Sequence, residues 1–211
     1  MQQSRRPLES RGSAWARALT SLLLKTRITP DQISLAGIGF ALLGSLAVLA
    51  APRQPWLFVA AALGIQLRLL CNLLDGLVAV EGGRRSAQGA LYNELPDRLE
   101  DSVLLVAFGQ AAGLLWLGLL SALLAAITAY VRVLGGTLGF AQDFGGPMAK
   151  PHRMAALTAI SLLACIEAHW WGSTQVLVLG LGLVALGTAW TIVRRTRQLA
   201  RRLGAQDGTR P

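Results

Sequence analysis

Acidic and amide side chains interrupt an otherwise apolar stretch between residues 68 and 101. On a helix, Asn72 and Asp75 are neighbours three positions apart, and Asn93 and Asp97 are neighbours four positions apart, so each pair shares a face. Two antiparallel helices would bring these faces together. Carboxylate and amide oxygens in one small volume suit a hard divalent ion such as magnesium, which keeps waters and substrate phosphates as its other ligands. The spacing therefore predicts metal-assisted chemistry on a phosphate-bearing ligand.

Small residues accompany the acids. Gly76 and Ala79 follow Asp75, and Gly89 precedes Asn93 by about one turn. Because these positions lack bulky side chains, a phosphate-bearing ligand can approach the backbone there.

Structural roles for the same residues stay open. The two aspartates could form intramembrane ion pairs with Arg68 or Arg98. The two asparagines could form interhelical hydrogen bonds instead of binding a metal. For Glu94, Glu100 and Asp101 we expect solvation or pairing rather than metal ligation.

A second group of charged residues is basic. Arg132, Lys150 and Arg153 fall near the ends of apolar segments, at the expected membrane surface. Beside an acidic cluster, such residues suit an anionic acceptor or a diphosphate. The alternative is that they only anchor the helices at lipid headgroups.

The elements that must position these residues are membrane helices. Of the 211 residues, 53% are hydrophobic and only 15% are charged, whereas a soluble domain carries about 25% charged residues. A soluble or disordered chain is therefore excluded, and a polytopic membrane protein is expected. The net charge of +9 comes from residues between and beyond the apolar runs, so we expect contact with a lipid bilayer and no nucleic acid.

The predicted fold is all-α, a polytopic membrane helical bundle with six transmembrane helices of ~20 residues each. An amphipathic interfacial helix over 14–24 precedes them, because its apolar residues recur at helical spacing over a length too short to cross the bilayer. We assign residues 1–31 to a cytoplasmic N-terminal segment, 32–198 to the membrane domain and 199–211 to a cytoplasmic tail. Residues 141–152 are expected to form a loop, and the spans cover 32–51, 56–80, 88–112, 114–138, 153–171 and 175–193.

The distribution of positive charge orients this topology. With the N-terminus in the cytoplasm, nearly all Lys and Arg residues fall on cytoplasmic segments, and the opposite loops hold only Arg53. This bias follows the positive-inside rule and requires an even number of spans. Both termini are therefore expected in the cytoplasm.

The spaced pattern resembles the signature of the CDP-alcohol phosphotransferase family, D-x2-D-G-x2-A-R-x8-G-x3-D-x3-D. Every spacing fits, and five of the eight fixed positions fit in identity. The departures are Asn72 and Asn93, where the signature has aspartates, and Val80, where it has arginine. The lead-in Thr29-Pro30-Asp31-Gln32 also looks like that of the family. The register here is Asn72-x2-Asp75-Gly76-x2-Ala79-Val80-x8-Gly89-x3-Asn93-x3-Asp97.

The resemblance implies a Mg²⁺- or Mn²⁺-dependent enzyme of phospholipid biosynthesis in the inner (cytoplasmic) membrane. It would move a phosphatidyl or other substituted phosphate group from a CDP-alcohol, such as CDP-diacylglycerol, to a hydroxyl acceptor and release CMP. The resemblance also implies a homodimer.

Residue roles follow from the same resemblance. The positions of Asn72, Asp75, Asn93 and Asp97 are those of metal ligands, and the last is also the proposed general base. The cytidine nucleotide would be held at Gly76, Ala79 and Gly89.

A non-catalytic function remains the alternative. Asparagine offers a carbonyl oxygen but no negative charge, so two substitutions weaken a site for two cations. The chain would then be a weakened or inactive family member that binds CDP-lipid or acts as a scaffold. Compensation by Glu81, Glu94, Glu100 or Asp101, or the use of one metal, would preserve catalysis.

Overall fold

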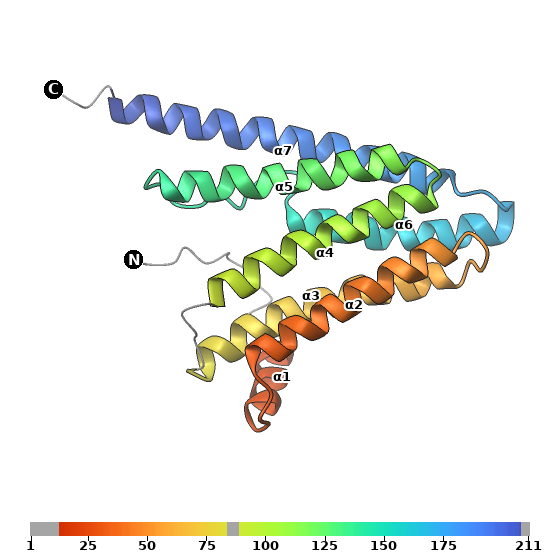
Figure 1. The fold of residues 1–211 in the computed structure, drawn as a ribbon, viewed down its shortest axis with the longest axis horizontal. Coiled ribbons are helices and arrows are strands. Elements are labelled where there is room, and N and C mark those ends of the chain that lie inside the picture. Colours follow the sequence, from red (N-terminus) through yellow and green to blue (C-terminus); the bar gives the residue numbers. More distant parts are fainter. Residues whose placement is uncertain (1–12, 84–88, 208–211) are drawn as a thin grey trace.

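The computed structural model describes residues 13–83 and 89–207, without the side chains of residues 89–93. In this part of the chain every regular element is an α-helix, which confirms the predicted all-α fold. Figure 1 shows the arrangement. The seven described helices are α1 (Ala14–Leu24), α2 (Pro30–Ala50), α3 (Leu57–Glu81), α4 (Gly89–Ala111), α5 (Leu115–Thr137), α6 (Lys150–Trp171) and α7 (Gln175–Asp207).

The six long helices form a bundle in which consecutive helices run in opposite directions (Figure 1). Helix α2 packs against both α3 and α4, α3 packs against α6, and α5 packs against α4 and α7. A single apolar core contains buried residues from all six, including Phe58, Phe108, Leu157 and Leu181. Burial of this surface between helices fixes how the polar faces of α3 and α4 are presented to each other.

Helix α2 begins at Pro30, two residues before the predicted span 32–51. The Thr29 hydroxyl accepts a hydrogen bond from the Gln32 backbone N–H at 3.2 Å, and the Gln32 side chain accepts one from the Thr29 N–H at 3.0 Å. This capping box satisfies two backbone donors that a helix start leaves free, and Pro30 occupies the first turn, where its missing N–H costs nothing.

Glycines allow a close approach of α2 and α3 and a tight turn between α4 and α5. A Cβ on Gly64 of α3 would lie 2.8 Å from the Cα of Gly44 in α2. The predicted break between the spans 88–112 and 114–138 is confirmed, since α4 ends at Ala111 and Gly113 adopts a left-handed φ of 72°, which glycine accepts without a Cβ clash.

Two helix boundaries differ from the predicted ones. The predicted loop 141–152 is wrong at its end, because α6 begins at Lys150. Pro151 was interpreted as a loop residue, but proline is well tolerated in the first turn of a helix. Helix α7 continues to Asp207, into the segment assigned to the tail. Its arginines end the apolar span but not the helix, since arginine is a good helix former.

Within the part of the chain that the structure describes, five helices are long and apolar enough to cross a membrane: α2, α3, α5, α6 and α7. Helix α4 is not among them, because its first half carries the charged residues from Glu94 to Asp101. The chain is thus a multi-pass membrane protein in which one long helix of the bundle is unusually polar.

Candidate active site

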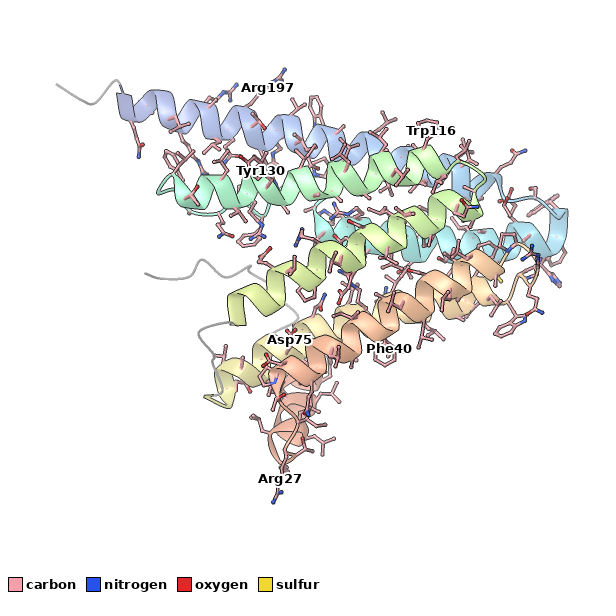
Figure 2. All side chains as sticks on the ribbon, in the orientation of Figure 1. Arg27, Phe40, Asp75, Trp116, Tyr130 and Arg197 are labelled. Carbon is pink, nitrogen blue, oxygen red and sulfur yellow. The ribbon has the colours of Figure 1, made fainter. Side chains whose placement is uncertain are left out.

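Asn72 and Asp97 meet across the gap between α3 and α4. The Asn72 Nδ2 donates a hydrogen bond to the Asp97 Oδ1 at 2.8 Å. The two residues lie on the faces that the sequence predicts to converge, and their contact brings the two halves of the spaced pattern together. Figure 2 shows the side chains of this region around the label of Asp75.

Asp75 faces α2 from one turn further along α3. It is only 5% exposed, and its Oδ2 accepts a hydrogen bond from the Ser34 hydroxyl at 2.6 Å. Ser34 thereby fixes the orientation of a buried carboxylate. Sequence reasoning missed Ser34, because only the packing of α2 on α3 places it beside an acid that is 41 residues away.

Cations surround Asp97. The Lys150 ammonium donates to its Oδ1, the same oxygen that accepts from Asn72. The Arg98 guanidinium lies 3.5 Å from its Oδ2. Lys150 was predicted as a possible phosphate contact, and the structure places it directly against the central acid, so both groups face the same polar volume.

A buried ionic network lies behind these residues. Arg68 of α3 is fully buried and donates to Glu100 and, at 2.6 Å, to Asp101 of α4. Arg153 of α6 is 1% exposed and donates to the second oxygen of Asp101 at 2.7 Å. Charges removed from water need opposite charges beside them to be tolerated. The network ties α3, α4 and α6 together, and Arg153 is engaged there rather than at a headgroup.

Arg132 occupies the edge of the site. Its Nη2 contacts both carboxylate oxygens of Glu94, at 2.7 and 2.6 Å, and its Nη1 donates to Gln142. A cavity beside it is lined by Arg195 and Arg202 among other residues. Positive side chains therefore continue from the acidic cluster toward the ends of α5 and α7.

The remaining predicted residues follow the helix register. Gly76 and Ala79 lie on α3 beyond Asp75 and are half-buried, and Gly89 is the first residue of α4. The side chain of Asn93 lies outside the described part of the chain.

The oxygen atoms of Asn72, Asp75 and Asp97 suit a cation, such as magnesium, that binds few protein ligands. Among the described side chains, no three from His, Cys, Asp and Glu lie close enough together to hold a metal, so there is no all-acid cage in this part. Magnesium, however, commonly uses one or two carboxylates together with substrate phosphates and water. Asp75 and Asp97, with the amide oxygen of Asn72, are a donor set of that kind.

Several known proteins are similar in sequence to this chain over most of its length. No family model matches it. The inner membrane protein YnbA of Escherichia coli (strain K12) is 29% identical over 189 residues, covering 84% of this chain and 87% of that protein. The phosphatidylinositol phosphate synthase of Mycolicibacterium smegmatis is 23% identical over 206 residues, covering 93% and 88%.

Solved structures share the fold. Mycobacterium tuberculosis phosphatidylinositol phosphate synthase (PgsA1) with CDP-DAG bound matches with a TM-score of 0.70 at 19% identity, over 89% of this chain and 94% of that one. The same enzyme in complex with manganese and citrate matches with a TM-score of 0.72 at 20% identity, over 87% and 88%. With the spaced pattern on α3 and α4, this chain is similar over most of its length to phosphatidylinositol phosphate synthases in sequence, and it shares their fold.

Proposed function

We propose that this protein transfers a phosphatidyl group from a CDP-alcohol, such as CDP-diacylglycerol, to a hydroxyl acceptor and releases CMP. The observation that carries the proposal is the meeting of Asn72 and Asp97 at 2.8 Å beside the buried Asp75, in the register of the family signature. The CDP-DAG bound to a relative of the same fold supports the donor.

The proposed reaction is a displacement at phosphorus. The acceptor oxygen forms a bond to the phosphorus that carries the diacylglycerol, the bond from that phosphorus to the bridging oxygen breaks, and CMP leaves with that oxygen. Asp97 takes the hydroxyl proton. In this role Asn72 and Lys150, which both donate to the Asp97 Oδ1, hold the carboxylate in place.

Asn72, Asp75, Asn93 and Asp97 are the residues we assign to a divalent cation, Mg²⁺ or Mn²⁺. Such an ion, when bound, offsets the negative charge of the diphosphate and of the departing CMP. Ser34 orients Asp75 toward this volume. The manganese in the complex of a structural relative supports the choice of metal.

The substrate groups are assigned to the surroundings of the acids. Gly76, Ala79 and Gly89 leave room for the cytidine nucleotide. For the acceptor we propose an anionic alcohol, because Arg132 and Lys150 lie beside the site and guanidinium and ammonium groups bind phosphate well. Arg153 is buried against Asp101 and acts there by positioning the network.

The membrane arrangement is also a proposal. We place α4 as a sixth span, since it packs in the bundle between α2 and α5, and both termini in the cytoplasm. We place α1 on the inner leaflet, because Trp15, Leu19 and Leu22 are exposed while Ala16 packs on α3. The domain limits 1–31, 32–198 and 199–211, the inner membrane and a homodimer complete this arrangement.

An assay of CMP release tests the function. The purified full chain is incubated with CDP-diacylglycerol, Mn²⁺ or Mg²⁺, and a panel of alcohols with and without a phosphate group. Asp97→Asn should lower turnover by at least about 100-fold, the lower end of what a general base contributes. Glu81→Gln, an exposed acid at the end of α3, should leave turnover unchanged. Folded protein with no turnover on any combination would contradict the proposal.

The second candidate is CDP-lipid binding without catalysis, which Asn72, Asn93 and Val80 favour because each departs from the signature. The double variant Asn72→Asp/Asn93→Asp distinguishes the two functions. If it gains CMP release that the natural chain lacks, while the natural chain binds CDP-diacylglycerol, the binding function is correct.

A further inference from the structure

One carboxylate oxygen in the buried network lacks a partner. Glu100 is 3% exposed, and its Oε2 accepts from the Arg68 Nε, but its Oε1 makes no hydrogen bond within the described part of the chain. An unsatisfied buried acceptor costs about 1–3 kcal/mol, more when it is charged. Such an oxygen calls for a ligand.

The same oxygen faces the site through a space that a glycine leaves open. A Cβ on Gly37 of α2 would lie 3.6 Å from the Glu100 Oε1 and 3.6 Å from the Asn72 Oδ1. Asn72 turns its Nδ2 toward Asp97, so its carbonyl oxygen is the atom directed at this space. Two acceptor oxygens facing one small volume repel each other unless a positive group lies between them.

Other acids near the site are already engaged. Glu94 pairs with Arg132 and lies 3.6 Å from Arg98. Asp101 uses one oxygen for Arg68 and the other for Arg153.

Glu81 is exposed at the end of α3. Of the four acids that could replace the missing charges, only Glu100 has both burial and an open oxygen on the Asn72 side.

We propose that Glu100 is a further ligand of the divalent cation in this chain, binding through Oε1 next to the Asn72 Oδ1, so that no more than two of the carboxylates of Asp75, Asp97 and Glu100 contact the ion directly and the third acts through a bound water. It supplies the negative charge that the signature aspartate would provide at position 72, while Oε2 stays on Arg68. This inference rests on the proposed function, because it assumes that a divalent cation binds the acids of α3 and α4.

Manganese binding tests the inference without turnover. Free Mn²⁺ is measured by electron paramagnetic resonance during titration of the full chain in uncharged detergent. Glu100→Gln keeps an oxygen for Arg68 but loses the charge, so the Mn²⁺ Kd should rise about 10-fold or more, the range in which residues supporting a metal site act. Glu81→Gln is the matched control and should keep the Kd of the natural chain.

A charge swap makes the test specific. Asn72→Asp in the Glu100→Gln background returns one carboxylate to the same volume, so it should restore Mn²⁺ affinity. A purely structural role of Glu100 predicts no restoration. An unchanged Mn²⁺ Kd in Glu100→Gln, with the natural chain binding Mn²⁺, would overturn this inference but leave the proposed function standing. No Mn²⁺ binding by the natural chain would instead overturn the metal assignment of the proposed function.

A second variant tests the space itself with every carboxylate intact. Gly37→Ala places a methyl group 3.6 Å from both oxygens and 3.2 Å from the Cys71 Cβ, and it should weaken Mn²⁺ binding while an unchanged Tm shows that the Cys71 contact is accommodated. Gly39→Ala, on the same helix with nothing within 4 Å of the new Cβ, should not. If Glu100→Gln does not fold, as judged by gel filtration and Tm, this pair decides. Equal Mn²⁺ affinity of both alanine variants would then reject the inference.

Discussion

Ser34 shows how one hydroxyl can set the geometry of a buried acid. Its hydrogen bond to the Asp75 Oδ2 is charge-assisted and short, at 2.6 Å. Hydrogen bonds to charged groups contribute about 1.5–3 kcal/mol, and 1.4 kcal/mol is about tenfold in a rate or affinity. We therefore expect Ser34→Ala to lower kcat/KM for CMP release about tenfold, by freeing the Asp75 carboxylate.

Ser45→Ala is the matched control for this prediction. Ser45 is a buried serine on the same helix, and among the described residues its hydroxyl bonds only to the Ala41 carbonyl, at 2.8 Å. Its removal should leave kcat/KM unchanged, while Ser34→Thr, which keeps the hydroxyl, should retain most activity. Equal losses in Ser34→Ala and Ser45→Ala would show that Ser34 acts only through packing.

The sequence alone predicts the chemical types in the site but not their pairing. That intramembrane charges need partners follows from desolvation, and the pairing of Asp101 confirms this. Which cation pairs with which acid depends on helix rotation and on long flexible side chains. Arg68 pairs with Glu100 and Asp101 and lies 3.6 Å from Asp97. The spacing of these residues in the sequence does not predict this pairing.

At the scale of the elements, the contact between α2 and α3 positions Ser34 and Asp75. Gly64 and Gly44 make that contact possible, since a Cβ on Gly64 would lie 2.8 Å from the Gly44 Cα and 2.9 Å from the Phe40 carbonyl oxygen. These are backbone atoms, so the strain cannot be relieved by rotating a side chain. Gly64→Ala must push the helices apart, and we expect a lower Tm in detergent and a loss of CMP release.

The control for Gly64→Ala is Gly39→Ala on α2. Its new Cβ meets nothing within 4 Å, and alanine is favoured over glycine in a helix by up to about 1 kcal/mol. Its Tm should stay the same or rise. If Gly64→Ala were as stable as Gly39→Ala, the close packing of α2 on α3 would not be what holds Ser34 against Asp75.

The sequence was enough to predict that the long helices exist, but it predicted their first and last residues less well. The length of the apolar runs predicts the long helices, and the capping residues from Thr29 to Gln32 determine where α2 starts. Lys150 shows the limit, because Pro151 is equally compatible with a loop and with a first helical turn. The choice decides where the Lys150 ammonium points, and the contact with Asp97 depends on it.

At the scale of the whole molecule, the charge distribution and the fold both single out one end of the bundle, which we propose is the cytoplasmic end. The start of α2 and the ends of α3, α5 and α7 lie toward the same end of the bundle (Figure 1). Figure 2 labels Arg27 and Arg197 toward that end and Trp116 toward the other. If this end is cytoplasmic, a polar site near it would meet cytoplasmic nucleotide and membrane lipid at once, as the proposed reaction requires.

This topology can be tested directly, because it depends on whether the polar helix α4 crosses the bilayer. If α4 crosses the bilayer, the number of spans is even and residues 27 and 204 lie on the same side. If α4 does not cross, the helices after it are inverted and these residues lie on opposite sides. Single-cysteine variants in a chain with Cys71 and Cys165 replaced by alanine separate the cases, using Arg27→Cys, Gln54→Cys, Gln175→Cys and Gly204→Cys, at positions that are all exposed.

A membrane-impermeant maleimide added to intact spheroplasts should label positions 54 and 175 and spare 27 and 204, with all four labelled after lysis. The expected result follows from the positive charge on the segments before α2 and after the apolar part of α7, which is retained in the cytoplasm. Labelling of 204 but not 175 in intact spheroplasts would place α5–α7 in the opposite orientation. The acids of α4 would then lie in a segment that does not span the bilayer, and the proposed sixth span would be wrong.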